Sequence, residues 1–215
     1  GTLGSHTAAL GEPYADAPET CGELRYRDDE LKDRVAACAG DGWSVALHAI
    51  GDVAAEQAVR VLRDAGGTRL HRIEHLQVVG RETLAALAGS GVGASVQPVH
   101  FNVDASWIAT RLGRREALLY PWRSVKEAGV PLGFGTDWPI APLDPRLGLD
   151  ATTGRHGEGL SEEAAWSAYT RGSAAVSGRD APRGTLRPGA LADFVVWDPG
   201  ARRVRATWVG GRQVF

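Results

Sequence analysis

The chain has 215 residues, of which 43% are hydrophobic and 23% charged, with 24 basic residues against 26 acidic ones. A chain of this length can bury a substantial core in one large domain. The formal net charge of -2 gives no sign of a polyanion partner or of electrostatic attachment to a lipid surface. No apolar run approaches the ~20 residues that a membrane-spanning helix needs. We therefore expect no nucleic-acid partner and no membrane partner.

The beginning of the chain and its cysteine content bear on cellular location. The opening residues, Gly1-Thr-Leu-Gly-Ser-His6, lack the basic and hydrophobic regions of a signal peptide. Two cysteines, Cys21 and Cys38, are too few for a disulfide framework. These features predict a cytoplasmic protein. The sequence contains no methionine, so we expect it to be a piece of a longer protein.

Most of the chain alternates between helices and short strands. Residues 1–27 are rich in turn formers and predict a surface loop. Amphipathic spacing and glycine-bounded apolar runs then predict, in chain order, helix 28–39, strand 43–50, helix 53–65, strand 70–76, helix 81–88, strand 93–99, helices 105–112 and 121–128, and strand 130–136. This alternation is typical of an α/β fold whose parallel strands are joined by helical crossovers.

The last third of the chain changes character. Residues 139–159 are rich in proline, glycine and aspartate and predict a loop, after which Ser161 is a good N-cap for a further helix. Residues 184–198 and 204–215 are β-rich, and Gly210-Gly211 predicts a tight hairpin turn. We therefore expect two units, an α/β domain over residues 1–180 and a small β appendage over residues 181–215.

Three polar residues, His48, His75 and Asp137, lie at the downstream ends of predicted strands. In a (β/α) barrel these ends converge at one mouth, where active sites are built. Two imidazoles and a carboxylate suit a divalent transition metal such as Zn2+. The metal would lower the pKa of a bound water to ~7 while the carboxylate of Asp137 moves protons. The pattern thus predicts metal ligands at all three positions and a catalytic role for Asp137.

Simpler interpretations stay open for each of these residues. A lone histidine in an apolar run is more often a hydrogen-bonded core residue, and an aspartate before Trp-Pro could brace a turn. His100 could meet substrate, although a surface position is the commoner one for a loop histidine. Trp138 could line an apolar substrate pocket. Metal identity is open as well, because histidine and aspartate also suit Fe2+, Mn2+ and Co2+.

Several strings are more specific than their spacing. They are Leu3-Gly-Ser-His-Thr-Ala-Ala-Leu10, His48-Ala-Ile-Gly-Asp52, Arg72-Ile-Glu-His75, Ala94-Ser-Val-Gln-Pro98, Gly135-Thr-Asp-Trp-Pro139 and Leu186-Arg-Pro-Gly-Ala-Leu-Ala-Asp-Phe194. In this order they resemble the amidohydrolase superfamily, in particular the amidohydrolase family 3 group that includes N-substituted formamide deformylase. The resemblance covers essentially the whole chain. It implies a metal-dependent hydrolase of non-peptide carbon–nitrogen bonds on a TIM-like (β/α)8 barrel with a small β-sandwich.

Carried over residue by residue, the resemblance assigns the same three side chains. His48 would match the metal-ligating histidine that ends the fifth barrel strand, His75 the one that ends the sixth, and Asp137 the aspartate that ends the eighth. The family's His-x-His pair and bridging lysine have no match, since Lys32 and Lys126 both lie on predicted helices. The resemblance therefore implies the second half of the barrel plus part of the sandwich, with at most one metal, Zn2+ being the first expectation.

Our functional hypothesis is a metal-dependent hydrolase that cleaves an amide-type carbon–nitrogen bond of a small molecule, this chain being the C-terminal part of a longer enzyme. The alternative is a catalytically inactive half-barrel fragment or association module. A hydrolase of another bond, such as a lactone or phosphoester, is a third possibility. For partners we expect the small-molecule substrate, together with a second copy of the chain or a missing N-terminal half.

Overall fold

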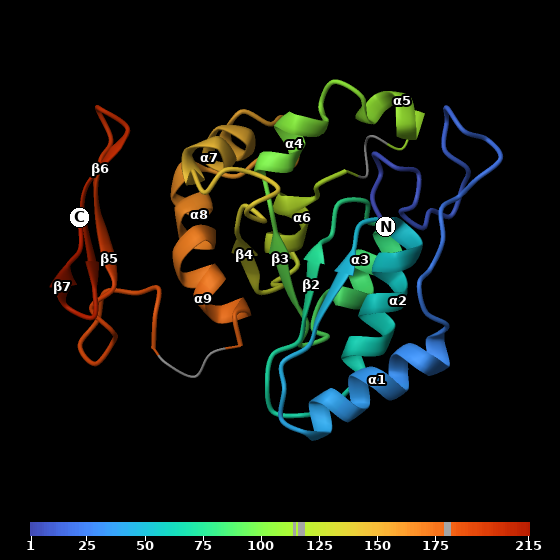
Figure 1. Ribbon diagram of the computed structural model, residues 1–215, viewed down its shortest axis with the longest axis horizontal. Helices are drawn as coiled ribbons and strands as arrows, with labels where there is room; N and C mark the ends of the chain where they lie inside the picture. The colour runs from blue at the N-terminus through green and yellow to red at the C-terminus, as the bar shows by residue number, and fades with distance from the viewer. Residues whose placement is uncertain (114, 116–118, 179–181) are drawn as a thin grey trace.

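The computed structural model describes residues 1–113, 115, 119–178 and 182–215 (Figure 1). Its centre is a parallel sheet of four strands that lie side by side in chain order, β1 (Ala46–Ala49), β2 (Arg72–His75), β3 (Gly93–Val96) and β4 (Leu132–Phe134). Ile73 pairs with Leu47 on one side and Ala94 on the other, and Ile73 and Ala94 are fully buried. The sheet confirms the predicted α/β class.

The sequence pattern predicts the main helices around these strands. Helices α2 (Asp52–Arg63), α3 (Arg81–Leu87) and α6 (Trp122–Glu127) lie between successive strands, whereas α1 (Asp28–Gly40) precedes β1 and α8 (Glu162–Ser167) follows β4. In α2 the buried residues Ala55, Ala58, Val59 and Leu62 follow the spacing of one helix face, which packs against β1 and β2. Ser161 is the N-cap of α8, where its side chain accepts a hydrogen bond from the backbone N–H of Ala164.

Three short helices differ in position or extent from the predicted elements. α4 (Val99–Asp104) begins at the last residue of the predicted strand 93–99. α5 (Ile108–Leu112) covers only the end of the predicted helix 105–112. α7 (Pro145–Thr153) lies within the predicted loop 139–159. The chemistry of the start of α7 explains it, because Asp144 accepts a hydrogen bond from Arg146 N and proline is favoured at the first helical position.

The helical segments that follow α8 pack closely against β4, the last strand of the parallel sheet. η2 (Ala168–Gly172) is a single π-helical segment that joins α8 to α9 (Ser173–Val176). η2 and α9 pack on β4, where Ser173 Oγ donates a hydrogen bond of 2.5 Å to the carbonyl oxygen of Phe134. Gly133 and Gly172 leave room for this contact, since a side chain on Gly172 would overlap the carbonyl oxygen of Leu132.

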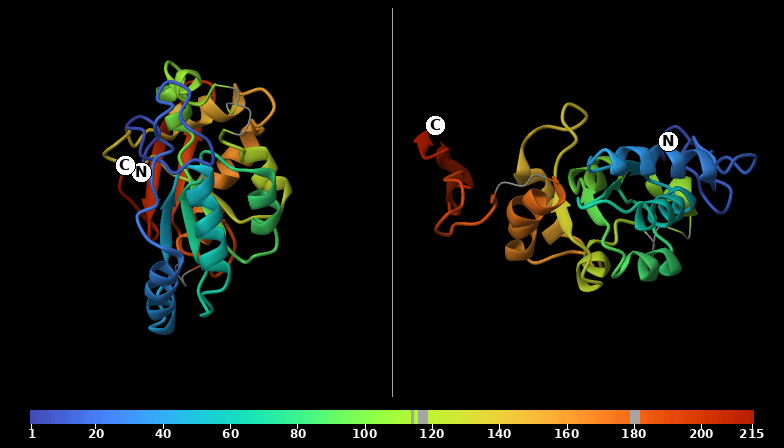
Figure 2. Two further views of the ribbon diagram at one scale, coloured as in Figure 1. Left: turned by 90° about the vertical axis from the view of Figure 1, so that its right-hand side faces the viewer. Right: turned by 90° about the horizontal axis from the view of Figure 1, so that it is seen from below.

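A separate antiparallel sheet follows, made of β5 (Phe194–Asp198), β6 (Arg203–Val209) and β7 (Arg212–Gln213) (Figures 1 and 2). The predicted Gly210-Gly211 turn joins β6 to β7, and both glycines have positive φ. The ring of Trp197 in β5 meets that of Trp166 in α8 edge-on at 5.3 Å between centroids. The predicted boundary between residues 180 and 181 lies outside the described residues.

Residues 1–27 form the predicted loop, but parts of it are buried. Leu3 and Tyr14 are each 1% exposed, and the Tyr14 hydroxyl donates a hydrogen bond of 2.9 Å to the carbonyl oxygen of Ala8. The loop lies beside α5 at the end of the sheet toward which the strands point (Figure 1). Within the described part of the chain, no helix has the length and apolar character needed to cross a lipid bilayer.

The contact between β4 and η2 makes a testable prediction. In Gly133→Ala the added Cβ would overlap Val176 Cγ2 and lie 3.0 Å from Ser173 Cα, so backbone must shift. We expect the free energy of unfolding to fall by about 1–3 kcal/mol, measured by urea denaturation. Gly135→Ala is the matched control, because its added Cβ meets no atom within 4 Å. Equal unfolding midpoints for the two variants would contradict the tight packing.

Candidate metal centre

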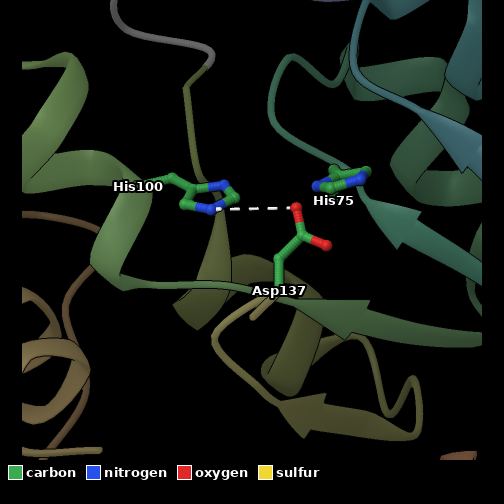
Figure 3. Close-up of side chains that lie close together, drawn as sticks. All are labelled: His75, His100 and Asp137. Atoms are coloured by element: carbon green, nitrogen blue, oxygen red, sulfur yellow. Dashed lines mark ion pairs between the residues drawn. The ribbon is translucent and has the colours of Figure 1, made fainter. Parts of the chain in front are cut away.

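Three side chains with metal-binding chemistry meet at the carboxyl end of the parallel sheet. His75 is the last residue of β2, His100 is the second residue of α4, just after β3, and Asp137 follows β4. One ligand atom of each lies within 4.8 Å of the ligand atoms of the other two. Figure 3 shows the carboxylate of Asp137 between the two rings, with His100 Nε2 4.0 Å from Asp137 Oδ2.

The backbone is strained at two of these positions. His75 has φ of 75° and Asp137 has φ of 61°, in the left-handed region that side chains other than glycine rarely adopt. Leu76, directly after His75, is also left-handed, with φ of 48°. Such conformations cost of order 1–3 kcal/mol each and gather at functional sites. The chain therefore turns sharply at the end of two strands, and each turn carries one of the clustered side chains.

Two imidazole nitrogens of the cluster have no hydrogen-bond partner among the described residues. His75 Nδ1 and His100 Nε2 are buried and make no hydrogen bond to any described residue. His71 is different, because its Nδ1 accepts from Val45 N at 3.1 Å and its Nε2 hydrogen-bonds to the carbonyl oxygen of Gly66 at 2.9 Å. His71 is thus a structural histidine, whereas the buried nitrogens of His75 and His100 remain available to a ligand.

Burial also determines the charge of His75, because the residue is only 9% exposed. The pKa of His75 is lowered from the usual 6.5 to about 4, first of all by burial and then by the neighbouring His48 and His100, while Asp137 and Glu74 oppose the decrease. The imidazole is therefore neutral at pH 7. A neutral imidazole is the form that coordinates a metal.

The remaining sequence-predicted site residues lie near this cluster but outside it. The ring of His48 in β1 meets that of His75 edge-on, with 4.4 Å between centroids, yet neither of its nitrogens joins the group of three. His48 Nε2 instead lies 2.8 Å from the carbonyl oxygen of Gly1. Trp138 is 64% exposed. The assignments of His48 as a metal ligand and of Trp138 as a substrate contact remain predictions.

A half-buried polar network lies directly beside His75. Arg72 Nε donates a hydrogen bond of 2.7 Å to Glu74 Oε1, and Gln97 Nε2 lies 3.5 Å from Glu74 Oε2. Gln97 is 6% exposed, and its Oε1 has no partner among the described residues. Strand register explains the network, because Glu74 pairs with Ser95, two residues before Gln97. Sequence spacing alone does not place Gln97 beside Glu74, because it does not show how β2 and β3 are paired.

The sequence pattern did not reveal the contact that anchors α4 and hence His100. The Tyr120 hydroxyl donates a hydrogen bond of 2.6 Å to Asp104 Oδ2. Burial raises the pKa of Asp104 and, together with the carboxylate of Asp104, that of Tyr120. One available signal was Pro98, because proline is common where helices begin, and the run from Val99 to Asp104 follows it.

The donor set fits a divalent transition metal. Two imidazole nitrogens and a carboxylate oxygen are the ligands that Zn2+ and its neighbours prefer, and three protein ligands leave a coordination position open. The buried, unpartnered nitrogens of His75 and His100 are the observation that supports this fit, since a buried polar atom without a partner is costly. Asp137 is 38% exposed at its side chain, so the carboxylate is reachable from solvent.

Comparisons with known proteins agree with this chemistry. The chain is 33% identical over 212 residues to YtcJ of Bacillus subtilis (strain 168), which is named as an amidohydrolase, and the match covers 91% of this chain and 40% of YtcJ. It is 31% identical over 241 residues to the protein LONG AFTER FAR-RED 3 of Arabidopsis thaliana, with 100% of this chain and 41% of that protein covered. This chain thus spans about two fifths of the length of these relatives.

Solved structures and the family profile point the same way. A structure described as an uncharacterized metal-dependent hydrolase from Pyrococcus furiosus matches with a TM-score of 0.81 and 38% identity, over 89% of this chain and 41% of that one. The profile of the amidohydrolase family, Amidohydro_3, matches residues 1–215. Fold, cluster and sequence relationship therefore lead to one conclusion, that this chain belongs to amidohydrolase family 3.

Proposed function

We propose that this chain supplies the metal-binding edge of a hydrolase that cleaves non-peptide, amide-type carbon–nitrogen bonds of small molecules. One observation carries the proposal: an accessible carboxylate, Asp137, lies between the imidazoles of His75 and His100, whose buried nitrogens have no partner among the described residues. Family membership supports the hydrolytic chemistry. Because the relatives extend well beyond the matched region, the proposal concerns the activity to which these residues contribute.

The roles of the residues follow from their chemistry. A divalent metal, with Zn2+ as our first expectation, would supply a Lewis acid that polarises the amide carbonyl and acidifies water. His75 and Asp137 would hold it. As water attacks the carbonyl carbon, Asp137 accepts a proton from that water and passes it to the nitrogen as the carbon–nitrogen bond breaks. The products are a carboxylic acid and an amine, so atoms and charge balance.

The neutral state of His75 supports metal binding at physiological pH. With a pKa of about 4, the folded His75 stays neutral, with one ring nitrogen unprotonated, throughout the range in which cells operate. In an unfolded chain the same imidazole titrates near 6.5. Protons therefore compete for His75 much less in the folded protein than they would in a solvent-exposed histidine, which favours coordination near pH 7.

This difference predicts a pH dependence of stability for the metal-free chain. Between pH 6.5 and about 4 the unfolded chain binds more protons at His75 than the folded one, so stability falls as the pH is lowered through that window. The full loss is about 3 kcal/mol. Urea unfolding of wild type and His75→Gln at pH 7.5, 6, 5 and 4 measures it, and the variant should show a shallower decline.

The exposed loop residue His156 offers the control for that experiment. His156→Gln should retain the pH dependence of the wild type, because the imidazole it removes is not buried. Equal pH dependence in wild type and His75→Gln would contradict the assignment of a desolvated imidazole at position 75.

Hydrolysis itself tests the proposed function. The longer enzyme to which we propose these residues contribute should, when loaded with Zn2+, release amine from a panel of N-formyl and N-acetyl amides, and a chelator should abolish the release. Asp137→Asn should lower kcat/KM by about 10²-fold or more, the contribution of a positioned acid–base group. The exposed residue Asp41 gives the control variant Asp41→Asn, with unchanged rates expected. Metal-independent rates, or equal rates in wild type and Asp137→Asn, would contradict the proposal.

A further inference from the structure

A segment of the loop that precedes α1, residues 9–16, runs between the residues that follow β1 and the helix α5. We call this segment the strap. It contains no helix and no strand of either sheet, and its loop lies beside α5 at the end of the sheet toward which the strands point (Figure 1). Loops at the carboxyl end of parallel strands build the active sites of α/β enzymes. The contacts that hold the strap therefore bear on the proposed site.

Close backbone contacts fix one end of the strap beside β1. Val53 N donates a hydrogen bond of 3.2 Å to the carbonyl oxygen of Ala9. Gly51 permits this approach, because a side chain at that position would overlap the same carbonyl oxygen. Gly11 N donates a further hydrogen bond of 3.0 Å to Asp52 Oδ1. This attachment depends mainly on the backbone, so it persists when side chains elsewhere in the strap are changed.

An ion pair fixes the other end of the strap to α5. Arg111 Nη1 donates to Asp16 Oδ2, and Arg111 Nη2 lies 3.3 Å from the carbonyl oxygen of Gly4. Ala15 N donates a hydrogen bond of 2.9 Å to the carbonyl oxygen of Arg111. The side chains of Arg111 and Asp16 are only 23% and 21% exposed. Partial burial shields the pair from solvent, so it contributes more than a fully exposed pair does.

A second arginine, four residues further along the chain, holds the middle of the strap. Arg115 Nη1 donates a hydrogen bond of 2.7 Å to the carbonyl oxygen of Glu12, and Arg115 Nη2 donates one of 2.5 Å to that of Pro13. A guanidinium presents its donors in a fixed fork, whereas the ammonium of lysine is a single point charge. Each of the two arginines therefore holds two acceptor groups of the loop at once.

The two attachment points of the strap flank the candidate metal centre. On one side the strap contacts the residues directly after β1, the strand in which the ring of His48 meets that of His75 at 4.4 Å between centroids. On the other side it contacts α5, which follows the helix that carries His100. The carboxylate of Asp137 is accessible at this same end of the sheet. A substrate that reaches it approaches from the end at which the strap lies.

We propose that the strap forms one side of the substrate site and that Asp16 and Arg111 are the positioning residues that hold it there. The inference rests on the proposed hydrolase function, but neither residue belongs to the metal-binding cluster. Loss of the ion pair would release the end of the strap at α5, while the backbone contact of Ala9 keeps the other end attached. Substrate binding should therefore weaken, and the chemical step should be retained.

Hydrogen exchange of the full 215-residue chain, followed by mass spectrometry, tests the attachment without any assay of activity. Asp16→Asn and Arg111→Gln should each speed exchange of the amides in residues 9–17 by about 10-fold or more, and exchange in the parallel sheet should stay as in wild type. The matched control is Arg63→Gln, because Arg63 pairs with Asp64 on the surface of α2, with 47% and 48% of the two side chains exposed.

Two further variants separate the ion pair from a general loss of stability. The double variant Asp16→Asn/Arg111→Gln should exchange no faster than the faster single variant, because both substitutions remove the same interaction. Arg111→Lys keeps the positive charge beside Asp16 but loses the fork, so its exchange rate should lie between those of wild type and Arg111→Gln. Wild-type exchange in both single variants, additive effects in the double variant, or faster exchange throughout the parallel sheet would overturn the inference.

Kinetics of the longer enzyme test the role in substrate binding. Asp16→Asn should raise KM for its amide substrate by about 3–10-fold and leave kcat within about twofold, the pattern of lost binding energy. An unchanged KM, or a fall in kcat alone, would overturn this role even if exchange in the strap is faster. If the wild-type longer enzyme shows no metal-dependent hydrolysis, the proposed function fails and the substrate role fails with it. The exchange measurement still decides whether Asp16 and Arg111 hold the strap.

Discussion

The parallel hydrogen bonding of β1 to β4 in chain order brings the carboxyl ends of all four strands to one edge of the sheet. Residues far apart in sequence, such as His75 and Asp137, become neighbours there because each follows a strand of the same sheet. The strained left-handed backbone at both positions turns each side chain at the point where its strand ends. Without this pairing, the cluster with His100 could not form.

Desolvation gives the cluster its chemical character. A buried imidazole with both nitrogens paired, such as His71, is part of the scaffold. A buried imidazole with an unpaired nitrogen, such as His75, is instead held neutral and ready to accept a cation. The same burial that makes an unpartnered nitrogen costly favours coordination, because a bound ion would satisfy the nitrogen that solvent cannot reach.

Local pattern was enough to predict the framework of the fold but not all of the site. The apolar runs around Leu47, Ile73 and Ala94 marked three strands, and position at a strand end marked His75 and Asp137 as candidates. The pattern does not predict α4, because six residues are too few to show helical periodicity. It does not predict α7, because proline and aspartate are typical of loops as well as of the first positions of a helix. The proximity of His100 depends on long-range contacts of α4 that no local spacing encodes.

The π-helical segment η2 has a geometric consequence for the end of the chain. In a π-helical turn the backbone hydrogen bond joins residues five apart instead of four, so the turn contains one additional residue. Each residue of a helix advances ~100° around its axis. The side chains before and after η2 therefore follow different stripes: Trp166 turns to Trp197 of the small sheet, and Ser173 turns to Phe134 of the large one. Removal of one residue from this turn would place the side chains before and after it on the same face of the helix. The continuous helix could then no longer contact both sheets.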